Sequence, residues 1–235
     1  MTSIYPQNHF LILGMTSVTA KSIVQFQNTL LKWYKTEGRD FPWRNKRLTH
    51  YQIIIAETLL QRTKAQTVSN FYFQFLKKFP NWHSLANADT SIIEMHLKPI
   101  GLYRQRAKRL KCLAQEMIKR KGKLPNNRSD LESIPFMGQY LANAVELLIH
   151  KKPLPLIDVN MARVLERYFG ERKMADIRYD PYLQELSFKV VNHKKSKEIN
   201  WAVLDFAAKI CKPTPLCVFC PLNNECRFYE SLIQT

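Results

Sequence analysis

Hydrophobic positions along this chain recur with the period of an α-helix. The clearest series has the i, i+3, i+4, i+7 spacing of one helical face and consists of Val68, Phe71, Tyr72, Phe75, Leu76 and Phe79. Pro80 follows this series and should end the helix, because proline cannot continue the hydrogen-bonded backbone. No stretch shows a convincing succession of the alternating patterns typical of strands. The pattern therefore predicts an all-α fold.

The same reading predicts helices along most of the chain. They are expected near residues 19–36, 50–62, 91–97, 103–121, 128–134, 139–150, 159–169, 181–191 and 197–210. Asp158 is a suitable N-cap for the helix at 159–169, since a carboxylate can accept hydrogen bonds from the first turn. Gly170 is a suitable stop after it.

Length and composition allow a globular protein with one large core or two smaller ones. The chain has 235 residues, of which 46% are hydrophobic, and only 6 glycines. The early apolar stretch 10–15 is too short to span a bilayer and lacks preceding basic residues. We therefore expect a soluble intracellular protein, in the cytoplasm or nucleoid, with residues 1–15 as a flexible tail.

Charge suggests a polyanionic partner. There are 36 Lys and Arg against 19 Asp and Glu, a net charge of +17, which favours salt-sensitive binding to a polyanion. A solvated surface is the ordinary alternative, but the cations cluster at Arg104, Arg106, Lys108, Arg109, Lys111, Lys119, Arg120, Lys121 and Lys123. No predicted helix joins a basic face to a broad apolar one, so nucleic acid is favoured over a membrane.

Four of the five cysteines lie within sixteen residues near the C-terminus. Their spacing is Cys211-x5-Cys217-x2-Cys220-x5-Cys226. Four thiolates can hold either a [4Fe–4S] cluster or Zn²⁺, and only the central pair has the short separation usual for zinc. Disulfides are disfavoured, because no secretory signal is present and Cys112 would remain unpaired. We expect Cys112, next to Leu113, to be an ordinary core cysteine.

Residues 129–140 read as a short helix, a tight turn with Pro and Gly, and the start of a second helix. Such a turn exposes backbone N–H groups, and the helix dipole favours an anion there, for which a DNA phosphate is suitable. Any helical hairpin supplies this geometry, so the motif alone is weak evidence.

Two carboxyl groups are candidates for catalysis. Asp158 follows an apolar run, which places it at the edge of the core, where capping and catalysis are compatible. Glu57 is the only charged residue in the apolar stretch 51–61 and shares a helical face with Ile53 and Leu60. Burial raises the pKa of a carboxyl and suits it to general-acid work, although a hydrogen-bonded structural role fits equally well.

Hairpin, downstream aspartate, helix-borne glutamate and terminal cysteine loop occur in the order found in a known family. From about Phe26 to Phe228 the chain resembles the helix–hairpin–helix DNA glycosylases with an iron–sulfur cluster, the endonuclease III, MutY and Mig superfamily. The segments most similar to Mig-type thymine–guanine mismatch glycosylases are Phe41-Pro42-Trp43-Arg44, Glu57-Thr58-Leu59-Leu60-Gln61-Arg62-Thr63, Ile100-Gly101-Leu102-Tyr103 and Arg167-Tyr168-Phe169-Gly170.

The resemblance implies a two-lobed architecture. One helical lobe would span 48–152 and contain the helix–hairpin–helix. The other would combine 16–47 with 153–235 and carry a [4Fe–4S] cluster on Cys211, Cys217, Cys220 and Cys226. The gap of five residues between the first two cysteines departs from the six usual in the family. The cluster's expected task is structural: to hold a loop whose basic residues, such as Lys209 and Lys212, can face phosphate.

The resemblance also assigns three catalytic positions. Asp158 matches the aspartate that stabilises oxocarbenium character at C1′ and orients or activates water. Tyr140 stands where strand-cleaving members carry a Schiff-base lysine, and a phenol cannot form that imine. Glu57 matches the pocket glutamate that contacts the extruded base.

Further positions match residues that contact DNA. Gln61 matches a residue that fills the hole left in the base stack, and Leu102 resembles the wedge that interrupts the opposite strand. The hairpin turn would contact DNA through Phe136, Met137, Gly138 and Gln139. The family's turn usually reads Leu-Pro-Gly-Val-Gly, and Phe136 replaces its first glycine. Either this turn differs, or the ring packs against DNA or the core.

These features predict a monofunctional DNA glycosylase of base excision repair. It would flip and hydrolytically remove a mismatched base, thymine or uracil opposite guanine, acting as a monomer on double-stranded DNA with a mismatched or damaged base. One alternative is an adenine DNA glycosylase of MutY type, acting on A opposite G or oxidised G, although that group commonly carries a further C-terminal domain. An alternative of another class is a non-catalytic mismatch-binding module, which need not retain Asp158 and Glu57.

Overall fold

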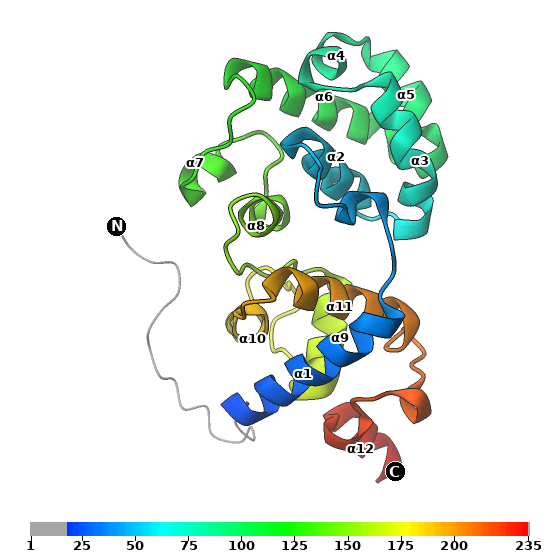
Figure 1. Ribbon diagram of the computed structural model, residues 1–235, viewed down its shortest axis with the longest axis vertical. Coiled ribbons are helices and arrows are strands. Elements are labelled where there is room, and N and C mark those ends of the chain that lie inside the picture. The colour runs from blue at the N-terminus through cyan, green and yellow to red at the C-terminus, as the bar shows by residue number, and fades with distance from the viewer. Residues whose placement is uncertain (1–17, 235) are drawn as a thin grey trace. The chain divides into compact units, whose positions relative to one another are not determined.

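The computed structural model describes residues 18–234, and every regular element among them is helical (Figure 1). This confirms the predicted all-α fold; the tail expected over 1–15 lies outside the described residues. The α-helices are α1 (Ala20–Glu37), α2 (His50–Leu60), α3 (Ala65–Lys78), α4 (Trp82–Asn87), α5 (Thr90–Leu97), α6 (Tyr103–Lys119), α7 (Arg128–Glu132), α8 (Gln139–Leu148), α9 (Val159–Phe169), α10 (Pro181–Val191), α11 (Ser196–Lys209) and α12 (Arg227–Ile233). Short 3₁₀ turns are η1 (Pro42–Arg44), η2 (Lys98–Ile100), η3 (Cys217–Phe219) and η4 (Asn223–Glu225).

Two helices, α4 and α12, were not anticipated. α4 is six residues long, too short for a hydrophobic period to appear. Its start nevertheless carries a capping box: the Asn81 side chain accepts from the Ser84 N–H, and the Ser84 hydroxyl accepts from the Asn81 N–H. The Asn-x-x-Ser spacing was the available sequence signal.

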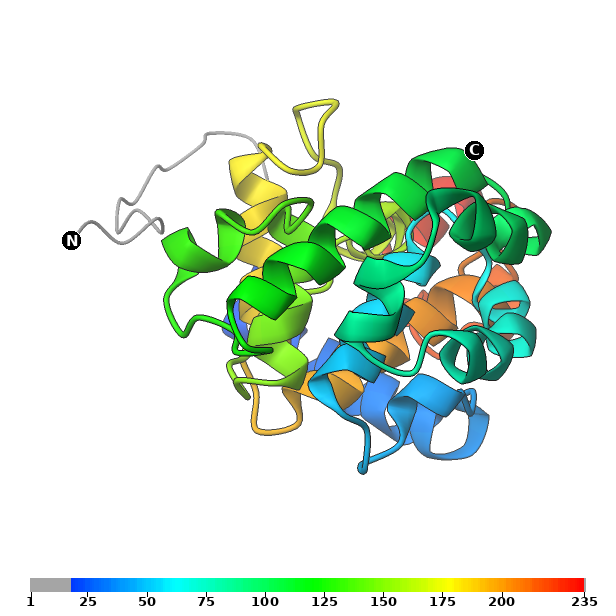
Figure 2. The ribbon, with the colours of Figure 1, turned by 90° about the horizontal axis from the view of Figure 1, so that it is seen from above.

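The chain separates into two compact units. Among the described residues, one comprises residues 18–39 and 153–234, and the other comprises Asp40–Lys152. In the second unit α6 forms one uninterrupted rod that packs against α4 and α5 (Figure 1, Figure 2). The core of this unit is built from α2, α3, α6 and α8 and includes Ile55, Leu59, Tyr72, Phe75 and Leu110.

The first unit has its own core, in which α1 and α9 pack against α11. Phe26 on α1 is fully buried, with ring centroids 4.9 Å from Tyr168 and 5.1 Å from Phe169 on α9. Gly170 ends α9 with a φ of 118°, which confirms the predicted stop. Asp205 is buried and accepts from the Arg39 backbone N–H at 2.8 Å and from its Nε at 2.7 Å.

Cys112 corrects one expectation. Its side chain is exposed, because the buried face of α6 is formed by Ala107, Leu110, Leu113, Ala114 and Met117. Cys112 lies two residues after Leu110, which is about half a turn around the helix. The expectation of a core cysteine is therefore wrong. No helix in the described part of the chain is both long and apolar enough to cross a membrane.

Candidate active site and nucleic-acid interface

Glu57 and Tyr140 meet inside the second unit. Glu57 is 3% exposed on α2, a helix with seven of its eleven residues buried. Tyr140, in the first turn of α8, donates its hydroxyl to Glu57 Oε2 at 3.0 Å. The prediction that Glu57 is desolvated is confirmed, and two predicted catalytic residues lie in direct contact.

The surroundings of Glu57 favour neutral groups. Burial raises the pKa of Tyr72, and the negative charge of Glu57 raises it further. The Tyr72 hydroxyl donates to the Gln52 carbonyl at 2.9 Å, which keeps the phenol in place. A carboxyl set among phenols in a largely apolar helix face is well placed to hold or pass a proton.

Asp158 is the N-cap of α9, as predicted. Its Oδ1 accepts from the backbone N–H groups of Asn160 at 2.9 Å and Met161 at 2.8 Å. Its Oδ2 accepts from Asn160 Nδ2 at 2.7 Å. Arg163 in turn donates to Asn160 Oδ1 at 3.1 Å. These donors fix the rotamer of a partly exposed carboxylate at a helix N-terminus.

The helical hairpin is formed by α7, a tight turn and α8, and an ion network around the buried Glu146 holds it together. Arg128 Nη1 donates to Glu146 Oε2 at 2.8 Å and to Asn143 Oδ1 at 2.5 Å, and Lys152 Nζ donates to Glu146 Oε1 at 2.9 Å. Burial alone would raise the pKa of Glu146, but hydrogen bonds from Lys152 and Arg128 bring it below its usual range. Sequence reasoning missed this network, because its members are spread from 128 to 152.

The turn before α8 combines buried and open positions. Met137 is buried, with 2% of the residue exposed. Gly138 is the N-cap of α8 without a side-chain hydrogen bond, and a Cβ added there would meet nothing within 4 Å. Gln139 and Tyr140 follow at partly exposed positions. The first turn of α8 thus begins beside open space.

Phe136 adopts the backbone conformation that a glycine would supply. Its φ is +66° and its side chain is 47% exposed, so the ring is not part of the core. The Arg109 guanidinium on α6 lies over the ring, 5.5 Å from its centroid. The left-handed conformation costs a residue with a Cβ about 1 kcal/mol. The turn therefore retains its glycine-like shape and presents an aromatic ring at its tip.

Gln61 and Leu102 both lie where a helix meets a loop. Gln61 is the C-cap of α2 and is partly exposed. Leu102 is the N-cap of α6, with a φ of 52° and 44% exposure, and follows Gly101, whose φ is 71°. An exposed leucine held in a left-handed conformation is unusual and is suited to insertion into an apolar stack.

The four clustered cysteines lie on one loop of the first unit. Cys211 is buried, and Cys217, Cys220 and Cys226 are half-buried. Burial raises the pKa of Cys220 to about 11, and the other three thiols contribute to that rise, so all four lie within electrostatic reach of one another. Soft thiolates suit an iron–sulfur cluster or zinc. Among residues 18–234 no three His, Cys, Asp or Glu side chains are grouped to hold a metal ion.

Arg167 braces the start of this loop. Its guanidinium donates to the Lys212 carbonyl at 2.6 Å and to the Pro213 carbonyl at 2.9 Å, and lies 4.6 Å from the Phe228 ring centroid. Lys209, one of the residues expected to face phosphate, pairs its Nζ with Glu37 Oε2 at 2.6 Å, and this pair is exposed.

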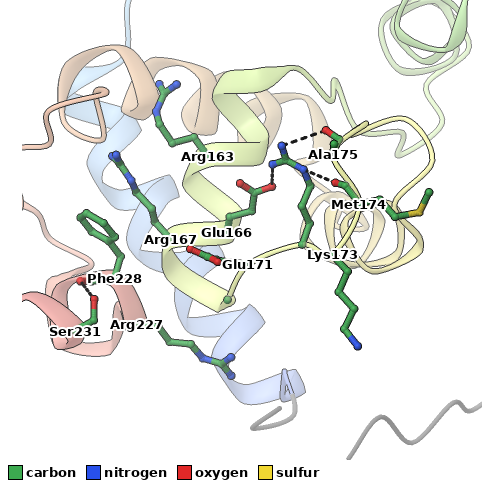
Figure 3. A pocket seen from close by; sticks show the side chains of 12 residues that line it. Arg163, Glu166, Arg167, Glu171, Lys173, Met174, Ala175, Arg227, Phe228 and Ser231 are labelled. Carbon is green, nitrogen blue, oxygen red and sulfur yellow. Dashed lines mark hydrogen bonds and ion pairs between the residues drawn. The ribbon is translucent and has the colours of Figure 1, made fainter. Parts of the chain in front are cut away.

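A hollow of about 580 Å³ opens beside the C-terminal part of α9 (Figure 3). Two of its cations have protein partners: Arg163 donates to the Cys211 carbonyl, and Arg172 contacts Glu166 and the Met174 carbonyl. None of the predicted catalytic residues lines it. We interpret the hollow as a junction between α9, the loop 170–175 that follows α9, and α12.

Known proteins resemble this chain over most of its length. A family model described as HhH-GPD superfamily base excision DNA repair protein matches residues 55–189. A thymine/uracil-DNA glycosylase of Pyrobaculum aerophilum is 38% identical, covering 88% of this chain and 92% of that protein. A solved structure of a thermostable thymine-DNA glycosylase is 35% identical with a TM-score of 0.83, covering 92% of this chain and all of that one. An adenine DNA glycosylase of Mus musculus is 28% identical, and the match covers 42% of its length.

Proposed function

The chain belongs to the HhH-GPD superfamily of base excision DNA repair proteins, and we propose that it is a monofunctional DNA glycosylase acting on thymine or uracil opposite guanine. The relatives named for thymine or uracil match at higher identity, and over more of their own length, than the adenine glycosylase does. The observation that carries the chemistry is the hydrogen bond from Tyr140 to the buried Glu57. Double-stranded DNA with a mismatched base is the proposed substrate, bound by a monomer.

Glu57 is proposed to assist the departing base. Burial disfavours the charged form of a carboxyl, and the Tyr140 hydroxyl fixes one of its oxygens. As the N-glycosidic bond breaks, its electron pair moves to the base nitrogen, and a hydrogen bond or proton from the protein stabilises that charge. A mispaired base costs less to extrude than a paired one, which contributes to selectivity.

Asp158 is proposed to act on the sugar. A carboxylate held by three N–H donors cannot turn away when positive charge develops at C1′. Water then forms the new bond to C1′ and loses a proton, for which the same carboxylate is the acceptor. The products are free base and an abasic site.

The absence of strand cleavage is part of the proposal. Cleavage by β-elimination needs an amine that forms an imine with the opened sugar, and Tyr140 offers a phenol. The DNA product should therefore remain intact until alkali is added.

We further propose that Cys211, Cys217, Cys220 and Cys226 hold a [4Fe–4S] cluster. Their shared loop, their burial or partial burial, and their mutual electrostatic influence support a common centre. When bound, the cluster would supply cross-linking of the loop rather than chemistry on the base. Iron, sulfide and zinc analysis of the purified protein distinguishes it from a zinc site.

Base release from a panel of duplexes tests the function. T·G, U·G, A·G and A opposite oxidised guanine are compared for the full chain, with and without alkali. We expect release of thymine or uracil, breakage only after alkali, and loss of release with retained binding in Asp158→Asn. Release of adenine alone would favour the MutY-type alternative, and binding without any release would favour a mismatch-binding module.

A further inference from the structure

One buried arginine connects the two loops that carry Gln61 and Leu102. Arg106, in the first turn of α6, is 5% exposed. Its Nη2 donates to the Gln61 carbonyl at 2.6 Å and contacts Thr63 Oγ1, and its Nη1 donates to the Ile100 carbonyl at 3.2 Å. A single planar guanidinium thus holds the turn after α2 and the turn before α6.

Both turns need such support. Arg62, directly after Gln61, has a φ of 58°, and Gly101 and Leu102 have φ values of 71° and 52°. Left-handed conformations of residues with a Cβ persist only where the surrounding structure fixes them. The fork of Arg106 bonds the Gln61 carbonyl before Arg62 and the Ile100 carbonyl before Gly101, and so fixes both turns relative to α6.

The groups that accept hydrogen bonds from Arg106 are neutral. Arg106 therefore fixes the positions of two turns and forms no ion pair with them. Burial lowers the pKa of Arg106, and the nearby charge of Arg62 lowers it further. A buried cation is costly without an anionic partner. An apolar side chain would fill the same space without that cost, but it could not bond two separate loops at fixed spacing.

We infer that Arg106 is a positioning residue. It holds the two turns that carry Gln61 and Leu102, here called the two tips, in one rigid element for base extrusion. The inference rests on the proposed function, because it assigns the two tips to the same DNA-opening step. Tips that are already ordered lose little conformational freedom on entering the base stack. Loose tips would have to be ordered at that moment, and extrusion would be less favourable.

Extrusion can be measured apart from base release. We would use Asp158→Asn as the background and a T·G duplex with 2-aminopurine beside the mismatch, whose fluorescence rises on unstacking. Arg106→Met should lower the extrusion equilibrium about tenfold. Gln27→Met is the matched control, since Gln27 is 6% exposed and donates to the Val190 carbonyl at 2.8 Å in the other unit. The control should stay within about twofold.

Coupling separates positioning from general stability. If Arg106 acts through the wedge residue Leu102, adding Leu102→Ala to Arg106→Met should lower the extrusion equilibrium by less than about a further twofold. Multiplication of the two single losses would overturn the inference. Arg106→Lys should recover only part of the signal, because one ammonium group cannot reproduce the fork. Full recovery by lysine would also contradict the proposed geometry.

A milder variant tests the inference even if Arg106→Met does not fold. Thr63→Val removes one acceptor and leaves the guanidinium in place, and it should lower extrusion about threefold with unchanged thermal unfolding. An unchanged extrusion signal in a folded Arg106→Met or Thr63→Val protein would overturn this inference alone. Absence of base release in the unmodified chain, and of extrusion in its Asp158→Asn background, would instead overturn the proposed function.

Discussion

Two carboxyl groups of similar chemistry lie in different settings. Asp158 is partly exposed, and three N–H groups hold its carboxylate. Glu57 is buried and accepts from a phenol. In such contrasting settings two carboxyl groups can take different chemical roles. These surroundings support the proposed assignment of Asp158 to the sugar and Glu57 to the base.

Tyr140→Phe tests the contact with Glu57. The variant keeps the ring and removes the hydroxyl, so base release should fall about tenfold to a hundredfold while binding to mismatched DNA changes little. Single-turnover release and a binding titration measure the two effects. Tyr51→Phe is the control, since it removes another buried hydroxyl, one that donates to the Phe79 carbonyl. Unchanged release in Tyr140→Phe would contradict a role for the hydroxyl.

Phe136→Gly tests why a phenylalanine stands in the hairpin turn. Relief of the left-handed strain is worth about 1 kcal/mol, whereas loss of the contact with Arg109 and the added freedom of glycine cost about the same together. Thermal stability should therefore change by less than about 1 kcal/mol. Affinity for mismatched duplex should fall about threefold to tenfold, because an exposed ring is lost from the tip. Unchanged affinity would show that the ring does not touch DNA.

At the scale of elements, hydrophobic periodicity and capping residues predicted the helices and helix ends that depend on neighbouring residues in the sequence. Asp158 and Gly170 delimit α9 as expected, because caps act within one turn. Local patterns could not predict the Arg128–Glu146 network or the fork of Arg106, because each joins residues that only tertiary packing brings together. Cys112 was misplaced because an apolar neighbour in sequence is not a neighbour on a helix face.

The hairpin should lose stability in acid through Glu146. Its pKa is lower in the folded protein than the ordinary value of 4.5, so its contribution is present above that value and is lost as pH falls through the folded pKa. Glu146→Gln should lower the free energy of unfolding at pH 7 by about 1–3 kcal/mol and weaken the dependence on pH below 4.5. Thermal unfolding across pH 3–7, about the range of carboxyl titration, measures both effects.

Asp176→Asn provides the matched comparison for Glu146→Gln. Hydrogen bonds from Arg178 lower the pKa of Asp176 to about 2, but this pair lies at the surface. Solvent screens such pairs, so Asp176→Asn should leave the unfolding midpoint unchanged. If the two variants lowered the unfolding midpoint equally, burial of Glu146 would add nothing to the stability of the hairpin.

At the scale of the whole molecule, stability is divided between two cores. Each unit encloses its own set of buried aromatic and aliphatic side chains, and the cysteine loop belongs to only one of them. The net charge of +17 gives the whole chain an attraction to phosphate that no single residue decides. Under the proposed function, specificity comes from local parts: the hairpin, the turns that carry Gln61 and Leu102, and the Glu57–Tyr140 pair.

Cys220→Ser tests whether the proposed cluster supports one unit selectively. Loss of a ligand should remove iron and loosen the loop that Arg167 braces, which lies in the unit of α1 and α9–α12. Hydrogen exchange should therefore rise in α9, α11 and α12, while amides of α2, α3 and α6 keep their protection. Cys112→Ser is the control, because that thiol is exposed on α6 and should leave iron content and exchange unchanged. Retention of a full iron complement in Cys220→Ser would remove this cysteine from the ligand set, and uniform loss of protection would show that the two cores unfold as one.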